Sequence, residues 1–180
     1  MISVFPNWKS FAVHQRRRLS GCIPTGYEMI LRSVSADGVD FTTFQDDFDL
    51  DINLGKSQTE PRNDFGSVAT AVKKRYPWVS FEQKSFGSGA EKIAFIDSTL
   101  AVQKPLLISL SMKPFGEKGW HIMPVVDATT EKYLLLEIVQ ADGTPMTQWI
   151  DKAVMSSVHD QFDGGKEVAF LADLGKPGAS

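Results

Sequence analysis

The sequence predicts a single α+β domain in which helices precede an antiparallel, strand-rich second half. The chain has 180 residues, a length that suits one domain with a sizeable buried core. Apolar residues in segment 22–33 recur at spacings of three and four, which is typical of a helix with one buried face. Apolar runs 120–127 and 133–139 flank a short turn and indicate a β-hairpin. This order of elements favours an α+β fold.

The expected helices have recognisable first turns or end before proline. Pro24 suits the first turn of the helix over 22–33, because its missing N–H would be unpaired there. Ser88 and Glu91 form a capping box at the start of a helix that ends before Pro105. The segments expected to be helical are 22–33, 67–76, 88–103 and 147–157.

The expected strands are short apolar runs, at 79–84, 106–112, 120–127, 133–139 and 168–171. Pro124 removes a donor from its strand, which favours an edge position or a bulge. Residues 47–54 alternate between polar and apolar, which predicts an extended segment. A calcium loop is not expected in this segment, because Ile52 and Gln58 stand where such a loop needs Gly and Glu.

Composition excludes several classes of protein. The 42% hydrophobic residues argue against disorder, and the net charge of −3 argues against a partner that is nucleic acid or an anionic membrane. No apolar run approaches the ~18 residues that span a bilayer, and the N-terminal charge order is the reverse of a secretory signal. Cys22 is the one cysteine, so no intrachain disulfide forms and a cytoplasmic location is expected. Residues 1–14 are expected to be an N-terminal extension and 175–180 a disordered tail.

Cys22 lies where a loop meets a helix, and its position allows two interpretations. A thiol there faces the positive end of the helix dipole and unpaired backbone N–H groups, which lower its pKa and supply oxyanion donors. The alternative is a small hydrophobic core residue, which is the usual role of a lone cysteine. Position alone favours the core residue.

His121 favours a reactive Cys22. It follows the loop 116–119 and opens an apolar strand, so that a general base there could reach a neighbouring element. The alternative is a core or rim histidine bonded to a carbonyl. His14 is a minor rival base because it is close to Cys22 in sequence, whereas His159 is expected at a solvated helix end.

A general base needs an orienting partner, and two carboxylates are candidates. Asp127 lies six residues along the same strand as His121, about 20 Å away at ~3.3 Å per residue. Glu137 lies across the hairpin, where cross-strand neighbours are ~5 Å apart, so it is the better candidate. A register slip of one residue would turn Glu137 to the wrong face.

The order of Gln15, Cys22 at a helix start, His121 opening a strand and then the acidic Glu137 resembles the papain-like cysteine peptidase superfamily. The most similar branch is the compact bacteriocin-leader-peptidase-like group. The turn 140–143 and an expected helix containing Trp149 also look similar to this group. The resemblance implies a papain-like fold, with the nucleophile at a helix start packed on a C-terminal antiparallel sheet.

Carried over residue by residue, the resemblance makes Cys22 the nucleophile and His121 the base and later acid. Glu137 would take the place of the family's Asp or Asn, and Gln15 would donate to the oxyanion with the Cys22 backbone N–H. Gly21 and Trp120, the chain neighbours of Cys22 and His121, are expected to contact substrate. The chain departs from the branch pattern Asp-Cys-Gly in having Gly21 and Ile23 beside the cysteine. The basic run 16–18 is expected to be a solvated patch.

The expected function is hydrolysis of a peptide or amide bond through a thioester, with a peptide or protein substrate and no cofactor. An amidase or acyltransferase with the same site is an alternative. A second alternative is a binding or effector module that keeps the fold but has lost the chemistry, which the unusual Ile23 and Glu137 would support. A metal site built from Cys22, His121 and Glu137 is disfavoured, because zinc sites of this kind usually contain a close ligand pair.

Overall fold

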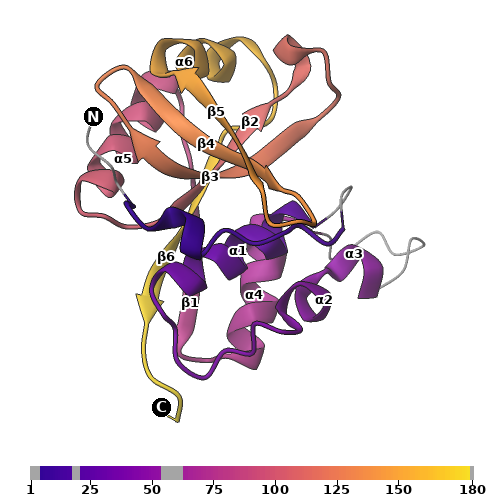
Figure 1. The fold of residues 1–180 in the computed structure, drawn as a ribbon. Coiled ribbons are helices and arrows are strands. Elements are labelled where there is room, and N and C mark those ends of the chain that lie inside the picture. Colours follow the sequence, from indigo (N-terminus) through magenta and orange to yellow (C-terminus); the bar gives the residue numbers. More distant parts are fainter. Residues whose placement is uncertain (1–4, 18–20, 54–62, 179–180) are drawn as a thin grey trace.

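The computed structural model describes residues 5–17, 21–53 and 63–178 (Figure 1). The helices are α1 (Cys22–Ser33), α2 (Phe44–Phe48), α3 (Leu50–Asn53), α4 (Phe65–Arg75), α5 (Gly89–Ala101) and α6 (Lys152–Gln161), with short 3-10 helices η1 (Trp8–Ser10) and η2 (Lys113–Phe115). The strands are β1 (Val79–Ser85), β2 (Leu106–Ser111), β3 (Trp120–Ala128), β4 (Lys132–Val139), β5 (Pro145–Asp151) and β6 (Glu167–Leu174). Figure 1 shows α1 to α4 together at one end of the molecule and α5 and α6 at the other.

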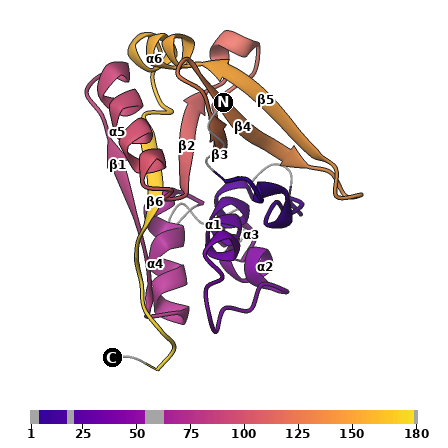
Figure 2. The same ribbon diagram turned by 60° about the vertical axis from the view of Figure 1, so that its left-hand side comes forward.

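The strands pair in the order β1-β6-β2-β3-β4-β5, and each pair is antiparallel. Every residue of the inner strand β2 is buried, because its two faces pack against different cores. Leu107 packs with α1, α2 and α4, whereas Ile108 packs with α5 and α6. Figure 2 shows α4 running alongside β1 on the first of these cores. The sheet thus holds α1, which begins with Cys22, against the middle of the molecule.

Helix α1 is fixed to the sheet by an aromatic stack and a close backbone approach. The Tyr27 ring is fully buried and stacks on the Phe81 ring at 4.0 Å between centroids, and its hydroxyl donates to the Phe65 carbonyl at 2.9 Å. A Cβ at Gly26 would lie 2.6 Å from the Leu107 side chain, so glycine lets α1 approach β2. Both contacts fix the position of the helix that carries Cys22.

Most elements agree with the sequence-based expectations to within a few residues. Helices α1, α4 and α5 and strands β1, β2, β3, β4 and β6 are confirmed. Ser88 caps α5 by accepting from the Glu91 N–H, while the Glu91 carboxylate accepts from the Gly87 N–H at 3.0 Å. The expected α+β class is confirmed. Within the described ranges, no helix is both long and apolar enough to cross a bilayer.

The expectation of an extended segment over 47–54 is wrong, because residues 47–48 end α2 and residues 50–53 form α3. Phe44 and Phe48 are both buried and lie one helical turn apart, so the helix buries them on one face. Asp46 and Asp47 lie in the first turn of α2, where the helix dipole favours negative charge. The polar–apolar alternation therefore does not mark a strand here, because the buried Phe44 and Phe48 are four residues apart, as on one face of a helix. Gln58 lies outside the described residues.

The expected helix over 147–157 is also wrong in its first half. Residues 145–151 form strand β5, which pairs with β4, and α6 begins only at Lys152. Trp149 consequently lies in a strand rather than in a helix. Thr147, Trp149 and Ile150 are residue types that favour strands, and the extended Asp151 marks the change to helix.

One smaller expectation, at His159, needs correction. His159 is not at a solvated helix end: its ring is buried where α6 packs on α5, and Nε2 donates to the Phe86 carbonyl at 3.1 Å. Near the C-terminus, the Gly175 N–H donates to the carbonyl of Trp78, the residue before β1, at 2.7 Å. Residues 179–180 lie outside the described residues.

Pro124 lies in an inner strand, at the point where β3 changes partner. Its register partner is Leu107 in β2, and from Val125 onward β3 pairs with β4. The register of that second pairing shifts between Val125 and Asp127. In the strand order β3 is thus an inner strand, its pairing at Pro124 is with β2, and a bulge lies close by.

Lys92 on α5 is fully buried, and its ammonium donates to the carbonyls of Ser109 at 2.6 Å and Gly165 at 2.9 Å. Burial, with a smaller effect of the nearby Lys166, lowers the pKa of Lys92 from 10.5 to about 8. Between these two values the unfolded chain holds a proton that the folded protein has lost. Stability from this group therefore increases as the pH rises through that window.

We expect the free energy of unfolding to rise with pH by about 2 kcal/mol between pH 7 and pH 10 because of Lys92, an order-of-magnitude figure from pKa linkage. Lys92→Met should remove that contribution. The measurement is urea denaturation of both proteins at several pH values, with the difference between them isolating Lys92 from groups such as Cys22. A constant difference across the range would contradict the prediction.

Candidate active site

Cys22 is the first residue of α1, and its half-buried side chain packs against β3. Three backbone N–H groups act to lower the pKa of the Cys22 thiol: those of Ile122, Ile23 and Cys22 itself. The first belongs to the residue that follows His121 in β3, and the other two belong to the helix start. The start of α1, with Cys22, therefore lies beside β3, the strand that carries His121.

Burial raises the pKa of the Cys22 thiol, and this effect exceeds the opposing effect of the three backbone N–H groups. The negative charge of Asp49 raises the pKa slightly further. The free thiol is thus protonated at neutral pH. A nucleophilic Cys22 consequently needs a base that removes the proton during the reaction.

The His121 ring is held by the main chain of Glu137. His121 Nε2 lies 3.3 Å from the Glu137 carbonyl oxygen. A carbonyl can only accept, so Nε2 carries the hydrogen and Nδ1 is left as the basic nitrogen. This geometry uses the backbone of the residue that the sequence indicated, rather than its carboxylate.

A β-bulge explains why the Glu137 carbonyl can face His121. In the pairing of β4 with β5, Leu136 opposes Thr147 and Ile138 opposes Met146, so Glu137 has no register partner. The pairing of β4 with β3 ends at Leu135. A residue in a bulge is left out of the ladder, and its polar groups can take other partners.

Cys22 and His121 line adjoining cavities that share two residues. Cys22 lies in a narrow slit of about 10 Å³, which has room for about one water molecule, together with Ile122 and Pro124. His121 lies in an open groove of about 770 Å³ that Trp120 and Met146 also line. Gln15 and Glu137 line both cavities. Between the described side chains of Cys22 and His121 there is no hydrogen bond.

Gln15 is buried at the boundary of the two cavities, in the segment that precedes α1. Its Nε2 donates to the Arg17 carbonyl at 2.9 Å. The same carbonyl accepts from the N–H of Gly21, the N-cap residue of α1, at 2.9 Å. This shared acceptor places the Gln15 carboxamide beside the helix start that carries Cys22.

Gly21 and Trp120 occupy different environments. Trp120 is exposed and lines the groove, as a substrate contact would. Gly21 is buried, and a Cβ there would lie 2.8 Å from the Arg17 carbonyl oxygen, so its small size serves the turn before α1. Gly21 lines neither the slit nor the groove.

The rival residues are engaged elsewhere. His14 lines the groove, but its Nδ1 donates to the Val139 carbonyl. Asp127 lies at the far end of β3, where its carboxylate accepts from the Ala128 N–H at 2.8 Å.

Arg16 and Arg17 of the basic run pair with Asp46, and Arg17 also pairs with Asp49. Arg18 lies outside the described residues.

Sequence reasoning missed Gln45 and Thr25, which are buried between α1, α2 and the segment that contains Gln15. Their contacts join parts of the chain that are distant in sequence, and a single polar residue in a short helix gives no local signal. Among the described residues, no three His, Cys, Asp or Glu side chains lie close enough together to hold a metal ion.

The comparison with solved structures bears on the fold. No protein-family model and no curated protein matches the sequence. Among solved structures, the chain is similar to a Bacillus anthracis protein described provisionally as a C39-like peptidase, with a TM-score of 0.57 and 11% sequence identity. The alignment covers 91% of this chain and 95% of that protein. The likeness shows that the two chains share a fold over nearly their whole lengths.

Proposed function

We propose that the protein is a papain-like cysteine hydrolase that cleaves a peptide or amide bond through Cys22. The observation that carries this proposal is the packing of Cys22, the first residue of α1, beside Ile122, which follows His121 in β3. The shared fold with a protein described as a C39-like peptidase supports it. The order of Gln15, Cys22, His121 and Glu137 favours the compact bacteriocin-leader-peptidase-like branch.

In the proposed reaction, His121 Nδ1 removes the thiol proton as the Cys22 sulfur attacks the substrate carbonyl carbon. Gln15 and the Cys22 backbone N–H donate to the oxyanion that forms. Collapse of this intermediate breaks the C–N bond, and the imidazolium gives its proton to the departing amine. Water then attacks the thioester, His121 takes the proton of that water, and the C–S bond breaks to release acid and thiol.

The structure describes a state in which the His121 ring faces the Glu137 carbonyl and Cys22 lies in the slit. The reaction therefore requires that the His121 ring, or the shared wall formed by Gln15 and Glu137, moves so that the imidazole reaches the thiol. Catalytic hydrogen bonds are often long or misaligned before substrate binds. The open groove beside His121 is where a peptide substrate would lie, with Trp120 in contact with it.

One observation favours a second function, a binding module without catalysis. The Cys22 thiol has a raised pKa and makes no hydrogen bond to the His121 ring, so the free site lacks an activated thiol pair. An amidase or acyltransferase would use the same residues as the hydrolase and differ only in its substrate or acceptor.

The test is acetyl transfer from p-nitrophenyl acetate to Cys22 at pH 7. We expect a burst of one equivalent of p-nitrophenol, an acetyl group on Cys22 by mass spectrometry, and no burst in Cys22→Ala. The control is the same protein unfolded in urea. A buried thiol with a raised pKa should react more slowly than an exposed one unless a base assists it.

We therefore expect the folded protein to be acetylated at least about tenfold faster than the unfolded chain, a modest part of what general base catalysis supplies. A folded protein that reacts more slowly than the unfolded chain would identify the binding module instead.

A further inference from the structure

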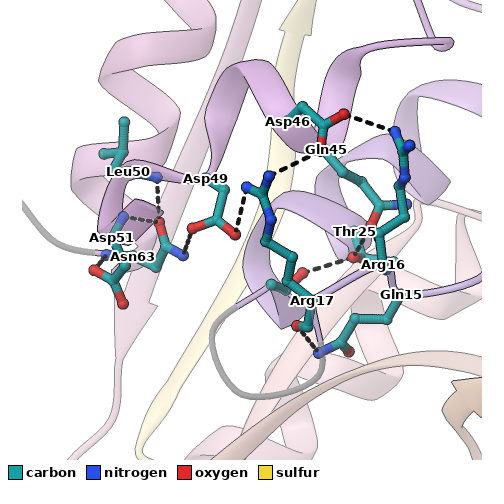
Figure 3. Close-up of polar contacts among 11 residues, drawn as sticks. Gln15, Arg16, Arg17, Thr25, Gln45, Asp46, Asp49, Leu50, Asp51 and Asn63 are labelled. Carbon is teal, nitrogen blue, oxygen red and sulfur yellow. Dashed lines mark hydrogen bonds and ion pairs between the residues drawn. The ribbon is translucent and has the colours of Figure 1, made fainter. Parts of the chain in front are cut away.

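The Gln45 side chain, on α2, is buried, and its carboxamide joins three segments of the chain (Figure 3). Nε2 donates to the His14 carbonyl at 2.8 Å and to Glu28 Oε2 at 2.9 Å. Oε1 accepts from the Arg16 N–H at 2.9 Å and lies 2.9 Å from the Thr25 hydroxyl, which shares its one hydrogen with the Gly21 carbonyl at 2.6 Å. A carboxamide has two hydrogens and two lone pairs, so these four bonds use its full capacity.

Two of the four bonds hold the backbone on either side of Gln15. Gln45 Nε2 donates to the carbonyl of His14, the residue before Gln15, and Gln45 Oε1 accepts from the N–H of Arg16, the residue after it. The carboxamide thus pairs with this segment as a neighbouring strand would. This pairing fixes the backbone of Gln15 and directs its side chain toward the Arg17 carbonyl and the two cavities.

The other two bonds hold the helix that carries Cys22. Thr25 lies about one turn after Cys22, and Glu28 lies about two turns after it. Both side chains are buried, and the Glu28 carboxylate also accepts from Arg32 at 3.1 Å. Through Gln45, the position of Gln15 is therefore set relative to the start of α1.

The Arg16–Asp46 ion pair beside Gln45 is a weaker candidate for holding Gln15 in place. Arg16 and Asp46 are both substantially exposed, with 51% and 41% of their side-chain surfaces accessible to solvent. Exposed pairs of this kind contribute about 0–1 kcal/mol. The buried carboxamide, whose bonds have no water to replace them, is the stronger constraint on Gln15.

We propose that Gln45 is a positioning residue that holds Gln15 where its amide donates to the oxyanion formed at Cys22. This inference rests on the proposed function, because an oxyanion arises only when the thiol attacks a carbonyl. Gln45 acts on the oxyanion through Gln15, so its effect is expected to be largest in reactions with a tetrahedral intermediate. Alkylation of the thiol has no such intermediate and depends on the base and on access.

The experiment compares two reagents on the same thiol, p-nitrophenyl acetate for acyl transfer and iodoacetamide for alkylation. The variants are Gln45→Met, which keeps the length of the side chain without its polar groups, and Gln15→Ala as the reference. We expect each variant to lower the acetylation rate by about 10- to 100-fold, since loss of one oxyanion donor costs about 10²- to 10³-fold in a serine protease. The rate of alkylation by iodoacetamide should change less than about threefold, because this reaction forms no oxyanion. A general collapse of the site would instead lower the rates of both reactions.

The double variant Gln15→Ala with Gln45→Met shows whether the two residues act as one unit. We expect it to be no slower in acetylation than Gln15→Ala alone, because a residue that acts through another adds nothing once that residue is gone. Multiplied effects of the two substitutions would overturn the proposal, and so would equal loss of acetylation and alkylation in Gln45→Met.

A second variant and two further outcomes separate the role of Gln45 from misfolding and from the proposed function. If Gln45→Met fails to fold by circular dichroism, Thr25→Val removes the hydroxyl contacts to Gln45 and to the Gly21 carbonyl with little change of shape. It should show a smaller loss of acetylation, again with alkylation little changed. A normal burst in Gln45→Met, with a reduced burst in Gln15→Ala, would overturn the role of Gln45 alone. No Cys22-dependent burst in the unsubstituted protein would overturn the proposed function and this inference with it.

Discussion

Replacing His121 by alanine should lower the rate of acetyl transfer to Cys22 by about 10²- to 10⁴-fold at pH 7, the usual contribution of a general base. The reason is the protonated state of the free thiol, whose pKa is raised by burial. Without the imidazole, the reaction depends on the small fraction of thiolate. The rate in His121→Ala should therefore keep rising as the pH increases beyond 9, which a stopped-flow pH series measures.

Two matched variants separate His121 from its neighbours. His14→Ala removes the rival histidine of the groove, and we expect it to lower the rate less than about threefold, far below a base's contribution. Glu137→Gln keeps the carbonyl that holds the His121 ring and removes only the carboxylate charge, so a similarly small effect is expected. A loss in His14→Ala equal to that in His121→Ala would contradict the assignment of the base. A large loss in Glu137→Gln would show that the carboxylate orients the ring.

Gly89→Ala should lower the free energy of unfolding by about 3 kcal/mol, which is at the upper end of the range for an overpacked site. Gly89 is the first residue of α5, where α5 meets α6. A Cβ there would lie 2.2 Å from the Ser156 carbonyl oxygen and 2.5 Å from its Cα, so backbone rather than a flexible side chain must move. The Gly89 N–H also donates to Asp160 at 2.7 Å, a bond that separation of the helices would break.

Gly87→Ala is the matched control for this change. It adds the same methyl group two residues earlier, where the added Cβ would have only ordinary contact with the Glu91 carboxylate at 3.4 Å. We expect Gly87→Ala to change the free energy of unfolding by less than about 1 kcal/mol, as is usual for an exposed site. Urea denaturation followed by circular dichroism compares the three proteins. Equal stability of Gly89→Ala and Gly87→Ala would contradict the close packing of α5 on α6.

Local pattern predicted the elements whose own residues determine them. The spacing of Ile23, Tyr27 and Ile30 predicted α1, and the Ser88 capping box predicted the start of α5. Around residue 47 the same reasoning failed, because a short polar–apolar alternation does not distinguish a strand from a helix. The buried Phe44 and Phe48, four residues apart, belong to a helix. In segment 145–161 it failed because a strand and a helix follow each other directly, with Asp151 as the change point.

The candidate site was predictable only where a residue's position in its own element was informative. Cys22 at a helix start and His121 at a strand start are local features, and the structure places both elements together. The bulge at Glu137 depends on the pairing of β4 with β5, so the sequence could indicate the residue but not that its carbonyl would face His121. Gln45 was missed because its importance arises entirely from contacts between α1, α2 and the segment before α1.

The bulge at Glu137 has a consequence for how relatives of this protein could be recognised. A carbonyl that orients the histidine belongs to the main chain, so the side chain at this position is free to diverge during evolution. Relatives could carry Asn, Ser or Ala there and still hold the imidazole, provided that the extra residue in β4 is kept. A search pattern that demands an acid at this place would overlook them, whereas one based on strand register would find them.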